Sequence, residues 1–315
     1  MSNPHWTDRP EGGGRFAIWL IRNIGLYGGR TFARLFLYPI TLYFYFRRRP
    51  EREASRAFLS RALGRPAGTL DVMRHIHRFA GVILDRVFLL ARNDVRQFQL
   101  TIHGLDLLLD TYHQGRGMLL LGSHVGSFEI LRVLAREKPE VKLKVLLDKS
   151  QTPAITELLH ALNPAVGDSV IDASEGGTAI VLNIKDAVEQ GSVVALLGDR
   201  ARPQEQTRSA IFFGQPAPLP TAPYLMASVL DTPVLLCFGL YRGGSRYDLH
   251  FEHFADRIEI PRSERRARLD EWIARYAARL EHHARLDPYN WFNFYDFWQS
   301  DRVEPAVPAG EPRGA

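Results

Sequence analysis

The sequence predicts an α/β protein: a mixed, mostly parallel sheet flanked by helices, preceded by a helical segment that associates with a membrane. From residue 99 onward, short apolar runs alternate with stretches of helical period, as buried strands and the helices that cover them do. The 315 residues are 45% hydrophobic and 24% charged, a composition typical of a folded chain with its own core. An aromatic, arginine-rich segment near the N-terminus supplies the third observation.

The N-terminal region divides into residues 1–14, polar and predicted to be disordered, and residues 15–50, predicted to contact a membrane. The longest uncharged run in the second part, Leu35–Phe46, has 12 residues, whereas a membrane-spanning helix needs about 20. The run is rich in aromatic rings and ends in Arg47–Pro50, a basic cluster suited to anionic headgroups. We expect a helix lying in the membrane plane, and the alternative is a core helix pair with solvated arginines.

Residues 51–302 are predicted to form one domain, with 303–315 as a disordered tail rich in proline, glycine and glutamate. Two helices come first, and a further long basic helix closes the domain. The predicted helices are Glu51–Leu63, Thr69–Ala91, Phe128–Arg136, Ile155–Leu162, Thr178–Glu189, Ala222–Leu230 and Ser263–Arg285. The predicted strands are Met118–Leu121, Lys144–Leu147, Ser169–Ile171, Val193–Leu197, Ile211–Phe213 and Pro233–Phe238, with Tyr247–Phe251 as an edge strand.

Several function classes are disfavoured by what the sequence lacks. Its single cysteine, Cys237, lies in an apolar run, which indicates a buried, inert thiol and excludes a disulfide framework. Neither a Gly-x-Gly-x-x-Gly motif nor a P-loop occurs, which argues against nucleotide binding. His103 and His113 have no metal-ligand spacing to His124, so we predict no metal. The charge of +5 favours anionic partners, among which composition alone does not choose.

A histidine followed five positions later by an acid occurs twice, at His124 with Glu129 and at His282 with Asp287. The spacing alone therefore carries no weight in a chain with 11 histidines and 35 acids. His282 lies in a charged helix and is expected to be solvated, whereas His124 directly follows an apolar strand, where open α/β sheets place their sites. Gly122 and Gly126 flank His124 and permit a tight turn before the helix that carries Glu129.

This pair suits acyl transfer to a hydroxyl group. Histidine titrates near neutral pH and can take the hydroxyl proton as a general base. A carboxylate behind the ring, here Glu129, would fix the tautomer and stabilise the imidazolium. The alternatives are a capping histidine with a surface glutamate, a thioesterase or lipase, and a non-catalytic lipid or membrane adaptor. Ser123 stands in Gly-Ser-His-Val-Gly, which is not a nucleophile elbow.

Residues from about Gly104 to Trp298 resemble the lysophospholipid-acyltransferase-like superfamily, and within it the lipid A biosynthesis (lauroyl/myristoyl) acyltransferases. The resemblance rests on four blocks: the histidine-x4-glutamate motif within Gly122–Glu129, Gly198–Arg200 after a strand, Ser209–Pro223, and the aromatic ending Pro288–Trp298. That ending looks like the subgroup of bacterial aryl-polyene or xanthomonadin pigment clusters.

The resemblance implies an O-acyltransferase without a cofactor, which takes its acyl group from an acyl carrier protein or coenzyme A thioester. The acceptor would be a lipid or glycolipid, and the enzyme would sit on the cytoplasmic face of the inner membrane. Catalysis would fall to His124 and Glu129. Substrate binding would fall to Lys149, Asp199, Arg200, Phe213, Gly214 and Thr221. Arg200 is a candidate for stabilising an oxyanion or a donor phosphate, and Thr221 for capping the following helix, where a phosphate could bind.

The chain departs from the family at Lys149, where lipid A acyltransferases often carry an arginine. Lysine supplies a point charge without the bidentate fork of arginine, which weakens the case for a phosphorylated, lipid A-like acceptor.

Overall fold

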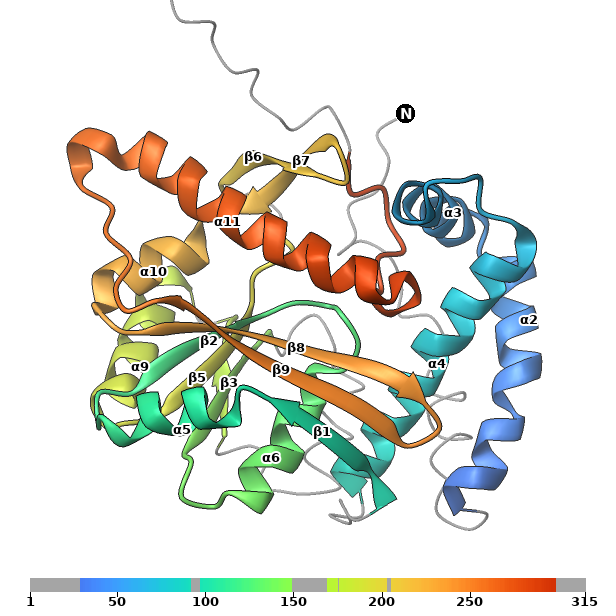
Figure 1. Ribbon diagram of the computed structural model, residues 1–315, viewed down its shortest axis with the longest axis horizontal. Coiled ribbons are helices and arrows are strands. Elements are labelled where there is room, and N and C mark those ends of the chain that lie inside the picture. The colour runs from blue at the N-terminus through green and yellow to red at the C-terminus, as the bar shows by residue number, and fades with distance from the viewer. Residues whose placement is uncertain (1–28, 92–96, 149–168, 175, 203–204, 299–315) are drawn as a thin grey trace, which may run out of the picture.

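The computed structural model describes residues 29–91, 97–148, 169–174, 176–202 and 205–298. The predicted lead at 1–14 and tail at 303–315, the helix Ile155–Leu162, and Lys149 lie outside these residues. The predicted α/β class is confirmed: a seven-stranded sheet of order β1-β9-β8-β2-β5-β3-β4 carries helices on both faces (Figure 1).

The five strands from β8 to β4 run parallel, and β9 turns back antiparallel to β8 through Gly243 and Gly244, both at positive φ. The strands are β1 (Gln99–His103), β2 (Met118–Gly122), β3 (Leu143–Leu147), β4 (Val170–Asp172), β5 (Val193–Leu197), β8 (Val234–Gly243) and β9 (Arg246–Ala255). Two expectations were wrong. β9 is not at the edge, because β1 pairs with its free side. Residues 211–212 belong to β6, outside this sheet, and the half-exposed alternation of β6 differs from the fully buried β2.

The central strands are buried on both faces, so their side chains alternate between two cores. In β2, Leu119 and Leu121 face the core covered by α11, while Met118 and Leu120 face the one covered by α4, α5 and α6. The helices are α4 (Thr69–Ala91), α5 (Leu105–His113), α6 (Leu131–Glu137), α9 (Gly177–Glu189), α10 (Ala222–Leu230) and α11 (Arg265–Leu286). Cys237 is buried in the second core, as predicted, and burial raises the pKa of its thiol.

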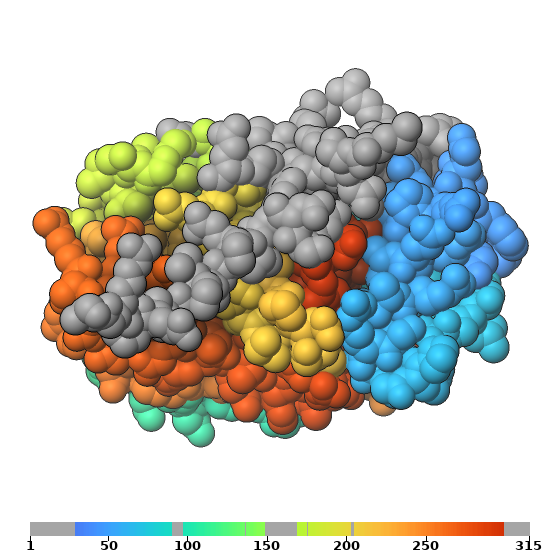
Figure 2. All heavy atoms as spheres, turned by 90° about the horizontal axis from the view of Figure 1, so that it is seen from above, coloured from blue at the N-terminus to red at the C-terminus, as the bar shows by residue number. Residues whose placement is uncertain are grey.

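A two-stranded hairpin of β6 (Thr207–Phe212) and β7 (Gln215–Pro220) lies on the α11 side. Figure 2 shows it between α3 (Arg49–Leu63) and α11. After α11, the chain passes through a short 3-10 turn, η5 (Pro288–Asn290), and an aromatic ending that packs into the first core.

The helix α2 (Leu37–Arg47) packs against α4 through Leu37, Thr41 and Tyr45. Its other side exposes the large apolar side chains of Tyr38, Leu42, Tyr43 and Phe46, and Phe32 and Leu35, which precede the helix, are exposed too. Among the described residues, no helix is long and apolar enough to cross a membrane. Not all of the nearby arginines are solvated, because Arg30 donates to the fully buried carboxylate of Asp85 at 2.8 Å.

Candidate active site

His124 lies at the carboxyl end of the central strand β2, in a turn of five residues before the 3-10 turn η3 (Phe128–Ile130). The backbone of this turn is fixed from two sides. Gly126 donates to the carbonyl of Asn290 at 2.7 Å, and Ser127 donates to that of Gly239 at 2.7 Å. Gly126 has φ of +67°, and a Cβ there would meet the Gly239 oxygen at 1.8 Å. Only glycine therefore fits, for both dihedral and steric reasons.

Asp199 follows the neighbouring parallel strand β5, so the two carboxyl strand ends bring it beside His124. Its Oδ1 lies 2.8 Å from Nδ1 of His124. Its Oδ2 accepts the backbone N–H of His124 and the indole N–H of Trp291, each at 3.0 Å. The Asp199 side chain is fully buried, whereas about a third of the His124 side chain (32%) is exposed. The ring is thus anchored at one nitrogen and open on its other side.

Opposed effects set the charges of this pair. Burial alone would raise the pKa of Asp199, but the imidazole and N–H groups of His124 together with Arg200 outweigh it and lower that pKa. Burial and the charge of Arg200 lower the pKa of His124, against the opposite pull of Asp199. At neutral pH, Asp199 is therefore a carboxylate that only accepts hydrogen bonds, so Nδ1 carries the hydrogen and Nε2 holds the free lone pair.

Glu129 does not take the place behind the ring that its spacing suggested. Its Oε2 accepts from Nε of Arg132 at 2.7 Å, and its Oε1 pairs with Nη2 of Arg86 at 2.8 Å. Burial would raise the pKa of Glu129, but the two guanidinium groups outweigh it and lower that pKa. The carboxylate that contacts the His124 ring is that of Asp199. Glu129 lies five positions after His124 in a short helical segment and is held by two arginines, so its side chain does not reach the ring.

The substrate residues expected from the resemblance fall into different places. Arg200, next to Asp199, donates to the carbonyl of Phe292 and lies 5.4 Å from the ring centroid of Tyr295. Its buried Nε has no partner among the described residues. Phe213 and Gly214 form the tip of the β6–β7 hairpin, where the Phe213 N–H donates to Glu281 of α11.

Thr221 precedes α10 as expected, but its hydroxyl makes no cap and donates to the carbonyl of Gln206 at 3.2 Å. The expected capping role is therefore wrong. A backbone bond from Thr221 to the same carbonyl shows that this residue closes the base of the hairpin.

The contacts of Ser123 do not support the alternative hypothesis of a serine hydrolase. This side chain is buried, and its Oγ accepts the backbone N–H of Val125 at 3.2 Å. In the second histidine–acid pair, His282 with Asp287, the histidine is solvated, as expected. His282 is exposed, and Asp287 pairs with Arg78 at 3.4 Å and caps the turn η5.

The sequence did not predict the residues that contact Asp199, Glu129 and the turn around His124 and fix their positions. Trp291 is fully buried, donates to Asp199, and packs edge-on against Phe212 of the hairpin at 5.0 Å. Asn290 fixes the turn and pairs with both backbone groups of Tyr241. Arg132 lies three positions after Glu129, a helical spacing that could have revealed it. Arg86, from α4, had no such signal.

Comparison with known families gives one match. The model of the bacterial lipid A biosynthesis acyltransferase family matches residues 58–300, a range that includes His124, Glu129, Asp199 and the aromatic ending. No curated protein matches the chain.

Proposed function

This chain belongs to the bacterial lipid A biosynthesis acyltransferase family, and on that premise we propose that His124 is the general base of acyl transfer to a hydroxyl of its lipid acceptor. The observation that carries this proposal is the bond between Nδ1 of His124 and the buried carboxylate of Asp199, which leaves Nε2 of a partly exposed ring free to accept a proton. A histidine held in this way needs no serine, because the acceptor hydroxyl itself is the nucleophile.

The reaction then runs in two proton transfers. Nε2 of His124 takes the hydroxyl proton as the acceptor oxygen attacks the thioester carbonyl carbon. Asp199 stabilises the imidazolium that forms. When the tetrahedral intermediate collapses, the carbon–sulfur bond breaks, and the imidazolium returns its proton to the leaving thiolate. The products are an ester and a free thiol, and the histidine ends neutral.

We propose a positioning role for Glu129: it holds Arg86 and Arg132 close to the reaction centre. Two guanidinium groups on one carboxylate leave a net positive charge in a poorly solvated place, and Arg86 acts on the pKa of His124. Nε of Arg86 and Nη2 of Arg132 are buried and have no partner in the part of the chain that the structure describes. With Arg200 they supply donors for the charge that develops on the thioester oxygen or for a donor phosphate.

The donor is proposed to be an acyl carrier protein or coenzyme A thioester, and the acceptor a lipid or glycolipid, including the pigment-type acceptors that the aromatic ending suggests. We further propose that the exposed side of α2 lies on the cytoplasmic face of the inner membrane. Tyr38, Tyr43 and Phe46 are each at least 60% exposed, and Arg47–Arg49 follow directly. Aromatic rings beside arginines suit the headgroup region of an anionic bilayer.

Mass spectrometry of lipids and pigments from cells with and without the gene tests the proposal. Complementation with wild type should restore the missing acylated species, and complementation with His124→Ala should not. Ser123→Ala should restore them, because acyl transfer does not use that hydroxyl. Rescue by His124→Ala at a wild-type protein level would contradict the catalytic role and favour the adaptor alternative.

A further inference from the structure

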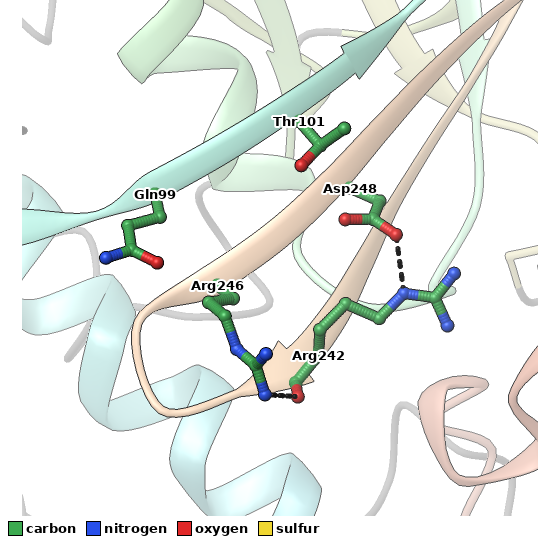
Figure 3. Close-up of a pocket in the computed structure, with 5 residues that line it drawn as sticks. All are labelled: Gln99, Thr101, Arg242, Arg246 and Asp248. Atoms are coloured by element: carbon green, nitrogen blue, oxygen red, sulfur yellow. Dashed lines mark hydrogen bonds and ion pairs between the residues drawn. The ribbon is translucent and has the colours of Figure 1, made fainter.

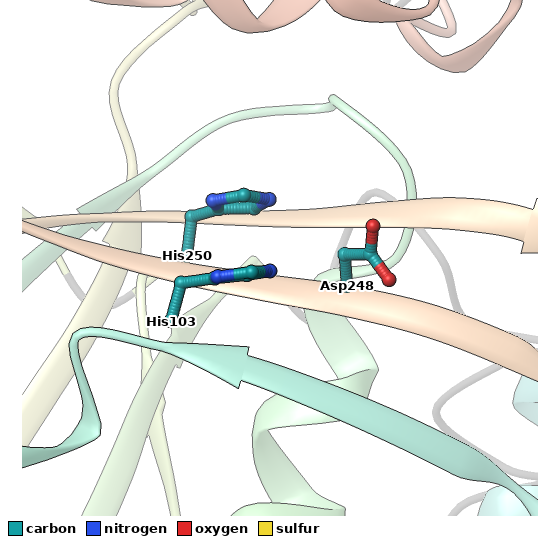
Figure 4. Close-up of side chains that lie close together, drawn as sticks. All are labelled: His103, Asp248 and His250. Carbon is teal, nitrogen blue, oxygen red and sulfur yellow. The ribbon is translucent and has the colours of Figure 1, made fainter.

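Two imidazoles and a carboxylate meet on the outer strands of the sheet, away from His124. The parallel register of β1 and β9 sets His103 directly opposite His250, and Asp248 lies two residues earlier on the same face. The rings are nearly parallel, 4.4 Å apart at 12°, and Asp248 lies beside their edges (Figure 4). One ligand atom from each of the three residues lies within 4.8 Å of the other two.

Two further features of this cluster point to a ligand. Among the described residues, the buried Nε2 of His250 has no hydrogen-bond partner, although a buried polar atom normally finds one. Oδ2 of Asp248 accepts from Nε of Arg242 at 2.7 Å, which orients the carboxylate and leaves Oδ1 available. Carboxylates that bind metals are commonly held in this way by a second group.

The cluster is also accessible. Asp248 and Arg242 line a polar cavity of about 460 Å³ together with Gln99, Thr101 and Arg246 (Figure 3). His103 is exposed on the edge strand, so an ion can reach the cluster from solvent and the ring can turn toward it.

We propose that His103, Asp248 and His250 bind a divalent transition-metal ion of the zinc class, with water at the remaining position. Two imidazole nitrogens and one carboxylate oxygen are a ligand set that zinc prefers. Bonds of about 2.0–2.1 Å place tetrahedral ligands roughly 3.3 Å apart, so the three atoms must close by about 1.5 Å at most. The bound ion would join the edge strand β1 to β9.

The test uses the full-length protein after treatment with a chelator. Zn²⁺ is titrated in competition with a chromophoric chelator, and Co²⁺ is added separately to record the d–d absorption of a four-coordinate site. Wild type should bind one equivalent, and His103→Asn should weaken binding by about tenfold or more. The control is His113→Asn, which removes an exposed histidine of α5 outside the cluster and should bind as wild type. Asp248→Asn is a second variant that keeps an acceptor for Arg242.

Thermal unfolding gives a second readout. Zn²⁺ at about 100 times its wild-type Kd should raise Tm by about 5 °C in wild type and in His113→Asn, and by about half of that or less in His103→Asn. Absence of stoichiometric binding in wild type, or unchanged binding in both His103→Asn and Asp248→Asn, would overturn the proposal. The site does not depend on acyl transfer, so His103→Asn should keep wild-type transferase activity.

Discussion

Replacing Asp199 by asparagine tests the arrangement around His124, because the change preserves the shape of the side chain and alters its hydrogen bonds. Oδ2 of Asp199 accepts two N–H groups, and Oδ1 faces Nδ1 of His124. An asparagine has one acceptor oxygen, and this oxygen is best placed where Oδ2 lies in wild type, since the N–H groups of His124 and Trp291 both point there. The amide NH₂ then faces Nδ1, which must become an acceptor. His124 is left with its hydrogen on Nε2 and can no longer take the proton of the acceptor hydroxyl.

The loss should be large in kcat and small in KM, because Asp199 is fully buried and acts through the ring. The same substitution in a Ser-His-Asp triad costs about 10⁴-fold in kcat, so we expect a fall of about 10³–10⁴-fold. This corresponds to roughly 4–5.5 kcal/mol of lost transition-state stabilisation. Losing the carboxylate charge should also lower the pKa of His124 further, because Asp199 raises it.

The assay measures transfer of an acyl group from its thioester to a lipid extract by mass spectrometry, and ¹⁵N NMR of the histidine rings reports the tautomer. Asp270→Asn is the matched control, since Asp270 pairs with Arg208 on the surface at 42% exposure. A folded Asp199→Asn protein that keeps more than a tenth of the wild-type kcat would refute the reasoning. So would an unchanged tautomer.

Four further predictions concern the turn, the arginine pair, and the pH dependence of activity and of stability. Gly126→Ala should lower Tm more than Gly214→Ala, because both glycines have positive φ but only the added Cβ at Gly126 meets backbone; the excess cost is about 2–3 kcal/mol, and equal Tm values would contradict the steric argument. Glu129→Gln should reduce kcat/KM by about tenfold or more, because it releases the guanidinium groups that supply donors to the developing charge; a wild-type kcat/KM would contradict the positioning role. In wild type, the acidic limb of kcat/KM should lie below pH 6.5, since the pKa of His124 is lowered and the neutral ring is the base. Because folding lowers the pKa values of Asp199 and Glu129, both carboxylates stabilise the folded state at pH values above their ordinary pKa values of 3.8 and 4.5. The free energy of unfolding, measured with urea, should therefore decrease as the pH falls below these values.

The sequence predicted the fold class because both signals for it are local. Runs such as Val193–Leu197 are too uniformly apolar for a half-exposed strand, and the helices between them have clear periods. Strand order is not local. The edge position of β1 and the inner position of β9 follow from how a hairpin docks onto the sheet, and nothing in Tyr247–Phe251 encodes it.

The candidate site was predicted from the positions of its residues after strands, and only partly from the spacing of His124 and Glu129. The rule that sites form at carboxyl ends of strands correctly placed His124 and Asp199 in one region. Spacing assigned the ring partner to Glu129, yet the neighbour of β2 in space is β5, which supplies Asp199 across 75 positions of sequence. Trp291, from the far end of the chain, was out of reach of any local pattern.

The central claim, that His124 is the base of acyl transfer, is tested most directly by the transfer rate of three purified full-length proteins. These are wild type, His124→Asn and His282→Asn, the last removing the exposed histidine of the second histidine–acid pair. With Tm values equal, we predict a loss of about 10²-fold or more for His124→Asn and none for His282→Asn. Equal rates for all three proteins would contradict the account.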